Sequence, residues 1–159
     1  MVAPKEVEVY EIREVFQAPL AFAYRWCTDY TEEDGSLSKE GNARQILRKT
    51  GRQVVYEDLT PSPEGWKWSR YAVTLHPPNR WTAVARGNYR AWNLVYTLRS
   101  LSEGRTELHL RGERRPVHLG RRNPSHRELE GELHRMWGNF GRAMARDYQA
   151  SRARRTARR

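Results

Sequence analysis

The sequence predicts an α+β fold in which one long helix lies across an antiparallel sheet of about seven strands. From Ala43 to Arg114, apolar and polar residues alternate with a period of two, in stretches rich in Trp, Tyr, Val and Leu. This pattern is typical of half-buried strands. Short turn sequences separate the stretches, so we expect neighbouring strands to pair as hairpins. From Ser125 to Gln149, apolar residues recur every three or four positions, as on one face of an amphipathic helix.

The first part of the chain predicts one strand, one helix and a loop. Val7 to Phe16 reads as the first strand. Pro19 suits the first turn of a helix, and the apolar residues that follow carry this helix to about Asp29. Thr31 to Asn42 is polar and contains two glycines, and we expect a loop there.

Five further strands are expected in the middle of the chain. They are Arg44 to Lys49, Gln53 to Leu59, Trp66 to His76, Trp81 to Gly87, and Ala91 to Leu101. A last strand follows Ser102-Glu103-Gly104, which fits a three-residue hairpin loop. That loop pairs Leu98 with Leu108 and Tyr96 with Leu110, which keeps apolar side chains on one face of the hairpin.

The closing helix has a defined start. Ser125 is predicted as its N-cap, and Glu128 three residues later completes a capping box. The apolar stripe of the helix consists of Leu129, Leu133, Met136, Trp137, Phe140, Met144 and Tyr148. A helix laid across one face of a long sheet can leave space beneath it, so this arrangement suggests a binding cavity.

The length and composition limit the class of protein. A chain of 159 residues is most simply one domain, which we place at residues 1–150. No apolar stretch is long enough to span a bilayer, and the first residues lack the apolar segment of a secretion signal. The lone Cys27 cannot form an internal disulfide. We therefore expect a cytoplasmic protein, and nothing in the sequence requires an oligomer.

The chain is strongly basic, with 29 Lys and Arg against 19 Asp and Glu and a formal net charge of +10. Residues 151–159 hold five arginines and no acidic residue. We expect a solvated, disordered tail there; the alternative is a tail that attracts nucleic acid or another acidic surface through phosphate-type contacts. Because the other residues carry only a moderate positive charge, nucleic acid is not the favoured partner.

Four segments carry a resemblance to a known superfamily. They are Val15-Phe16-Gln17-Ala18-Pro19 running into Phe22-Ala23-Tyr24-Arg25-Trp26-Cys27-Thr28-Asp29, the connection Leu75-His76-Pro77-Pro78-Asn79-Arg80-Trp81, the hairpin Glu103-Gly104-Arg105-Thr106, and the closing amphipathic helix. In this order they resemble the helix-grip superfamily called SRPBCC, which includes START lipid-transfer domains, plant pollen allergens and polyketide cyclase/dehydrase-like proteins. The resemblance covers roughly residues 5 to 149.

The resemblance implies a helix-grip fold, in which a curved antiparallel sheet wraps around a long C-terminal helix. Such domains usually enclose a cavity between the sheet and the helix for lipids, sterols, polyketides or other aromatic compounds. Some are enzymes and many only bind or carry their ligand. The resemblance therefore implies architecture more strongly than activity.

Most of the candidate ligand-binding residues are large and apolar. They are Tyr71, Trp92, Leu94, Tyr96, Leu98, Leu110, Trp137, Phe140 and Met144. Tyr and Trp combine an apolar ring with a polar edge, which suits a partly wet pocket. The alternative is that these residues form an ordinary core.

Three arginines, Arg70, Arg86 and Arg111, lie within strand patterns. Such a charge lies either on the solvent face or inside with a partner. A one-residue change in the hairpin at residues 88–90 would move Arg86 from one face to the other. Arg86 is therefore retained as a candidate that would bind a carboxylate, phosphate or enolate oxygen of the ligand.

No catalytic set stands out in the sequence. Glu57 and Asp58 are adjacent on a strand and should face opposite ways, which argues against a carboxylate pair. The five histidines show no metal-ligand spacing, so we expect neither a metal nor a cofactor. Binding or transport of a hydrophobic or aromatic small molecule is the first interpretation. A cavity enzyme of polyketide cyclase or dehydratase type and a nucleic-acid-associated basic protein are the alternatives.

Overall fold

A computed structural model describes residues 7–37, 39, 41–63, 65–88, 90–116 and 125–158. In chain order its elements are β1 (Glu8–Phe16), α1 (Leu20–Thr28), α2 (Asp34–Leu37), β2 (Ala43–Lys49), β3 (Gln53–Thr60), β4 (Lys67–His76), β5 (Arg80–Gly87), β6 (Arg90–Ser102), β7 (Arg105–Pro116) and α3 (His126–Ala157). The strands form one antiparallel sheet in the order β1-β7-β6-β5-β4-β3-β2. This is the α+β arrangement that the sequence predicted.

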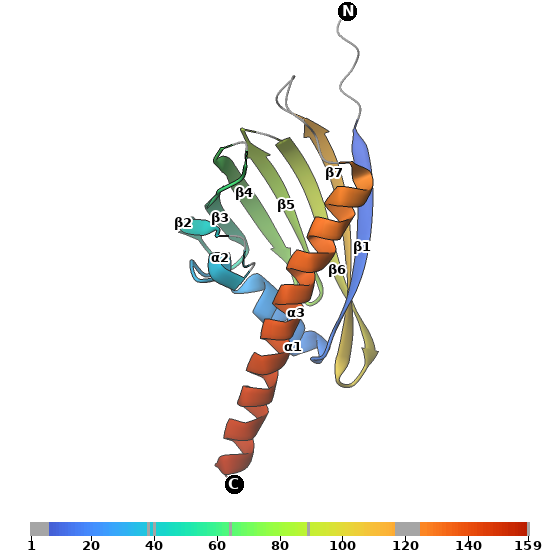
Figure 1. The fold of residues 1–159 in the computed structure, drawn as a ribbon. Coiled ribbons are helices and arrows are strands. Elements are labelled where there is room, and N and C mark those ends of the chain that lie inside the picture. Colours follow the sequence, from blue (N-terminus) through green and yellow to red (C-terminus); the bar gives the residue numbers. More distant parts are fainter. Residues whose placement is uncertain are drawn as a thin grey trace, which may run out of the picture.

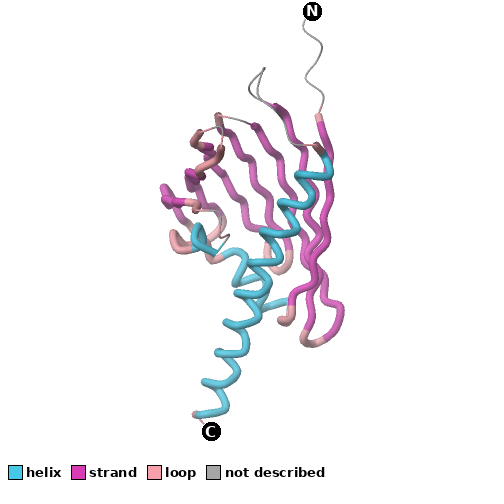
Figure 2. Tube along the Cα trace, viewed as in Figure 1, coloured by secondary structure: helices cyan, strands magenta, loops and turns pink. Residues whose placement is uncertain are grey.

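The sheet is strongly curved, and α3 crosses its concave face (Figure 1). The strands from β2 to β7 pair in chain order, while β1 pairs with β7 at the far edge. The two short helices between β1 and β2 lie near the middle of α3 (Figure 2). The sheet and the three helices therefore enclose the interior from opposite sides.

The hairpin between β6 and β7 has the predicted register. Tyr96 lies opposite Leu110, and Leu98 lies opposite Leu108. The predicted capping box is also present: the Ser125 side chain accepts a hydrogen bond from the Glu128 backbone N–H (3.1 Å), and Glu128 Oε2 accepts one from the Ser125 N–H (3.0 Å). This exchange satisfies backbone donors that the first turn of a helix leaves without partners.

Helix α3 is longer than the sequence predicted. The apolar stripe indicated an end near Gln149 and a disordered tail from residue 151, but the structure continues the helix through Ala157. Figure 1 shows these last turns extending beyond the sheet. The expected tail is thus helical from residue 151 to Ala157, Arg158 is the C-cap, and Arg159 lies outside the described residues.

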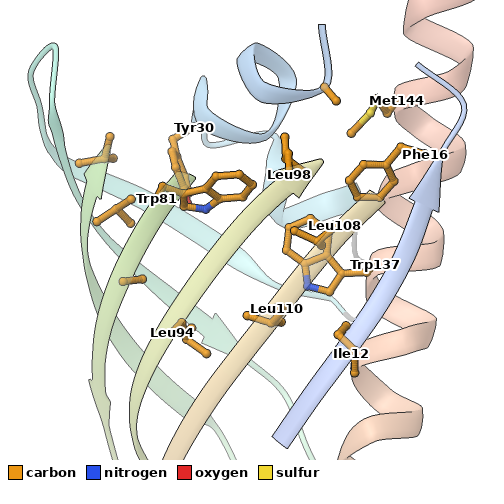
Figure 3. Close-up of a cluster of buried hydrophobic side chains, with 14 of the residues drawn as sticks. Ile12, Phe16, Tyr30, Trp81, Leu94, Leu98, Leu108, Leu110, Trp137 and Met144 are labelled. Carbon is orange, nitrogen blue, oxygen red and sulfur yellow. The ribbon is translucent and has the colours of Figure 1, made fainter. Parts of the chain in front are cut away.

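The core lies between the inner face of the sheet and the buried face of α3. Figure 3 shows its largest side chains, with Phe16 and Met144 toward one end and Leu94 and Leu110 farther along the strands. Trp81 is fully buried and its ring stacks on Tyr96, with ring centroids 4.8 Å apart. The alternation of the strands therefore directs their large apolar residues toward α3, as expected.

A β-bulge in β2 decides which of its residues face inward. The register against β3 shifts by one residue between Ile46 and Arg48, leaving Leu47 as the extra residue. As a result Ile46 lies opposite Tyr56, and Arg44 lies opposite Asp58. Because side chains alternate along a strand, the bulge brings Arg44 to the inner face.

In the part of the chain that the structure describes, no helix combines the length and the apolar character needed to cross a bilayer.

Candidate functional site

A cavity of about 260 Å³ lies between α3, α1 and the inner face of the sheet. One wall comes from α3, with Leu133, Met136, Trp137 and Phe140. Trp26 of α1 borders it, and its indole N–H donates to Asp147 of α3 (2.7 Å). That bond holds α1 against α3, so the cavity has a helical wall made of two connected elements.

Seven of the sequence candidates line this cavity. They are Tyr71, Trp92, Leu94, Tyr96, Leu110, Trp137 and Phe140. They come from β4, β6, β7 and α3, which the sheet order and the crossing helix bring together. The structure thus places most of the predicted side chains around one space.

Leu98 and Met144 do not line the cavity, which corrects their prediction. Both are fully buried and belong to the solid part of the core. Helix α1 packs against β6 and β7 and fills the space near this end of the strands. Met144 lies two turns beyond Trp137 along α3, roughly 10 Å farther along its axis. The cavity therefore ends before it reaches either residue.

Arg86 lies on the outer face of the sheet and does not reach the cavity. Its neighbour Ala85 is completely buried on the inner face, opposite Trp92 and Tyr71, so Arg86 must point the other way. Arg70 and Arg111 are also outside, paired with Glu57 and Glu113. The solvent-face alternative holds for these arginines, and the inward placement of Arg86 is wrong.

Stacked tyrosines form the wall of the cavity on β3 and β4. The rings of Tyr56 and Tyr71 are nearly parallel, with centroids 4.8 Å apart and an angle of 7° between them. Tyr30 continues the row, with its ring centroid 5.4 Å from that of Tyr56. On the other side, Tyr96 lies 5.7 Å from Trp137. The cavity is therefore bordered by flat aromatic surfaces from the sheet and the helix.

Burial keeps the phenols of this wall uncharged. It raises the pKa of Tyr56 well above its ordinary value, and it raises that of Tyr30 in the same way. Neutral phenols carry an O–H, so both side chains keep a hydrogen-bond donor at neutral pH.

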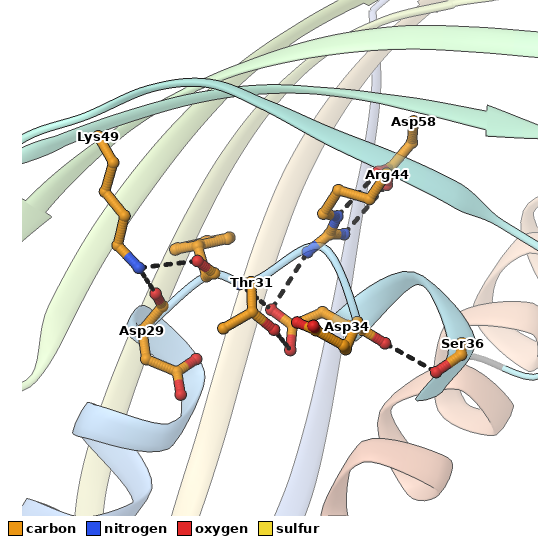
Figure 4. Close-up of polar contacts among 9 residues, drawn as sticks. Asp29, Thr31, Asp34, Ser36, Arg44, Lys49 and Asp58 are labelled. Atoms are coloured by element: carbon orange, nitrogen blue, oxygen red, sulfur yellow. Dashed lines mark hydrogen bonds and ion pairs between the residues drawn. The ribbon is translucent and has the colours of Figure 1, made fainter.

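A polar cluster forms one end of the cavity (Figure 4). Arg44 Nε donates to Asp58 Oδ1 (2.8 Å), and Arg44 Nη2 donates to Asp58 Oδ2 (3.0 Å). Arg44 Nη1 lies 3.4 Å from Asp34 Oδ2, and Asp34 also accepts from the Thr31 backbone N–H (2.9 Å). The Arg44 guanidinium lies 4.1 Å from the centre of the Tyr56 ring. Charge and aromatic surface therefore meet at this end.

The turn between α1 and α2 is fixed to β2 beside this cluster. Lys49 Nζ donates to the carbonyl oxygens of Asp29 and Tyr30, the latter at 2.8 Å (Figure 4). Tyr30 has a φ of +36°, a left-handed conformation that is uncommon for a residue with a side chain. The Lys49 contact and the stacking on Tyr56 hold Tyr30 in this conformation, so the turn carries its ring into the cavity wall.

Sequence reasoning missed the polar cluster. Glu57 and Asp58 face opposite ways on β3, as expected: Glu57 points outward, and Asp58 is nearly buried on the inner face, where no site was predicted. One signal was available: Val54, Tyr56 and Asp58 are spaced two residues apart and therefore share a face. Arg44 had no such signal, because the bulge at Leu47 sets its orientation.

In the polar cluster, the carboxylates of Asp58 and Asp34 already accept hydrogen bonds from Arg44, and Asp34 also accepts one from Thr31. Among the described residues, no three His, Cys, Asp or Glu side chains gather in a way that could hold a metal ion. Cys27 borders the cavity, and burial raises the pKa of its thiol, which disfavours the reactive thiolate. The site can stack a flat ligand and offer it N–H and O–H donors.

Comparison with known proteins gives structural but not sequence relatives. No protein-family model and no curated protein matches the sequence. The protein TTHA0849 of Thermus thermophilus superposes with a TM-score of 0.72 at 11% identity, over 86% of this chain and 97% of that one. The Zhui aromatase/cyclase from a Streptomyces species gives 0.65 at 12% identity, over 95% and 96% of the two chains.

A START superfamily protein of Mycobacterium smegmatis gives a TM-score of 0.64 at 11% identity, over 89% of this chain and 97% of that one. At such low identity the agreement concerns the fold. It confirms the architecture that the resemblance implied, a curved seven-stranded antiparallel sheet around a long C-terminal helix. The chain therefore has a helix-grip fold, which it shares with this START superfamily protein.

Proposed function

We propose that this protein binds an aromatic small molecule that carries oxygen acceptors at one end. The observation that carries the proposal is the pairing of flat aromatic walls with one polar end in a single cavity of about 260 Å³. Aromatic rings gain from offset or edge-to-face contact with other rings, beyond the area they bury. A planar ligand between the tyrosine row and Trp137 would make such contacts on both faces.

Arg44 supplies hydrogen-bond donors at the polar end. Arg44 has five N–H groups, of which three donate to Asp58 and Asp34 among the described residues. The two that remain can serve a carbonyl, phenolate or carboxylate oxygen. In the proposed complex this oxygen lies near Arg44, and the rings extend toward α3.

A second donor supports a ligand with a further acceptor. Trp137 lines the cavity, and its buried indole Nε1 has no hydrogen-bond partner within the described part of the chain. Buried donors in proteins are almost always paired, and an unpaired one costs free energy. A small shift of the indole on binding would let a ligand oxygen act as its acceptor.

A cavity enzyme of cyclase or dehydratase type is the second candidate function. The observation that favours it is the position of Arg44, whose positive charge would polarise a carbonyl placed at this end. The fold shared with an aromatase/cyclase agrees with this candidate. Chemical turnover of a bound aromatic compound would distinguish the enzyme from a carrier, which releases its ligand unchanged.

Calorimetric titration with a hydroxylated flavonoid, and with oleate as the aliphatic comparison, tests the proposal. Ser69 borders the cavity on β4, two residues before Tyr71, so Ser69→Phe should fill part of the space and weaken flavonoid binding at least tenfold. The matched control Ser100→Phe, at an exposed position outside the lining, should bind like the wild type. Equal binding by both variants, or binding of oleate alone, would overturn the proposal.

A further inference from the structure

The last turns of α3 form a second feature of the molecule, separate from the cavity. Tyr148 is the last large side chain of the helix that packs on the body, with its ring 5.0 Å from Phe22. Residues 150–158, here called the arginine segment, follow it and contain Arg152, Arg154, Arg155 and Arg158. All four arginines are exposed, and the segment extends beyond the sheet (Figure 1).

Contacts with the body of the protein do not neutralise this concentration of charge. No ion pair joins any of the four arginines to an acidic residue that the structure describes. Arg152 lies three positions from Arg155, and Arg158 lies three and four positions from Arg155 and Arg154. Like charges at these spacings repel one another across adjacent turns and weaken the helix.

We infer that the arginine segment binds the phosphate backbone of a nucleic acid. Guanidinium groups donate to phosphate oxygens in a two-pronged geometry, and phosphates would remove the repulsion among the four charges. At steps of 100° per residue, the four arginines fall within an arc of about 160°, so they share one side of the helix. A helix roughly 10–12 Å wide fits a major groove about 12 Å wide, and a charged side about 160° across can reach the phosphates that border the groove.

The segment lacks what a membrane surface would require. Its other residues are Ala150, Ser151, Ala153, Thr156 and Ala157, none of which is large and apolar. Helices that lie on a bilayer insert a face of large apolar residues and place their charges on the opposite face. The arginine segment has its charges on one side but no large apolar residue on the other, so its composition favours nucleic acid over lipid.

Salt dependence measures the number of phosphate contacts directly. Four neutralised phosphates correspond to a slope of roughly −3.6 in log K against log salt, or about a 150-fold loss of affinity between 50 and 200 mM salt. Fluorescence anisotropy with a labelled 20-base-pair DNA duplex is the assay. The wild type should show this slope, and R152Q/R154Q/R155Q/R158Q should show one shallower than −1.

A second quadruple variant provides the control for overall charge. R52Q/R86Q/R105Q/R115Q removes four exposed arginines from the body and also lowers the formal net charge from +10 to +6. It should keep the wild-type slope. An equal loss in both variants would show that general charge attracts the duplex, and would overturn the inference. Binding of the wild type to phosphatidylglycerol vesicles at affinities equal to those for DNA would do the same.

Discussion

Replacing Arg44 with Met tests the buried ion pair at the end of the cavity. The side chains of Arg44 and Asp58 are only 9% and 11% exposed, so water does little to solvate Asp58 once its partner is gone. Removing one partner of such a pair typically costs about 3–5 kcal/mol. In a domain of this size each kcal/mol lowers the melting temperature by about 2–4 °C, so we expect a loss of roughly 6–20 °C.

A double variant should recover the stability that the single variant loses. Arg44→Met with Asp58→Leu removes both charges of the pair, and Asp34 keeps its hydrogen bonds from Thr31, so the free energy of unfolding should return to near that of the wild type. Urea unfolding of the four proteins in this cycle gives the coupling energy between the two residues.

The pair between Arg70 and Glu57 offers a matched control, because Glu57 is the sequence neighbour of Asp58 but lies on the outer face. The Arg70 side chain is 55% exposed, and Arg70→Met should cost no more than about 1 kcal/mol. If Arg44→Met proved no more costly than Arg70→Met, or if the double variant were as unstable as Arg44→Met, the argument from burial would be refuted.

Two further perturbations test other parts of the structure. Gly112→Ala should destabilise the protein by about 1–3 kcal/mol in urea unfolding, because its Cβ would overlap the buried ring of Tyr10; Gly104→Ala, with open space around it, should not. Burial, and secondarily the nearby Asp34, raises the pKa of Asp29 to about 6 from a usual value of about 3.9. The folded state therefore binds the proton more tightly, so wild-type stability should fall as pH rises from about 4 to 6, relative to Asp29→Asn; parallel pH profiles of unfolding would contradict this.

Local rules were sufficient where a turn or a cap determines the structure. The β6–β7 register followed from a three-residue loop that ends at Gly104, since only one pairing keeps Leu98 and Leu108 on the same face. The start of α3 followed from the Ser125 capping box. In both cases residues close together in the sequence carry all the necessary information, and alternation then placed most of the cavity residues correctly.

The sequence was insufficient where a β-bulge or a contact between distant residues determines which side chains face the cavity. The bulge at Leu47 leaves no mark in the hydrophobic pattern, yet it turns Arg44 inward. The extent of the cavity depends on where α1 packs, and so Leu98 was misplaced. The arginine segment has no apolar periodicity; it continues as a helix through alanines, which favour helices, and arginines, which suit the negative end of the helix dipole.

The cavity under α3 gives the protein room for a ligand but lowers its thermal stability. At about 24 cal/mol per Å³, a void of 260 Å³ corresponds to at most about 6 kcal/mol, less whatever hydration recovers. This is comparable with the whole net stability of a typical domain. A larger residue at Leu94 or Ser69 would recover part of that free energy, because its side chain would fill space that the ligand needs. At these positions a substitution that increases stability therefore reduces ligand binding, and selection for one property acts against the other.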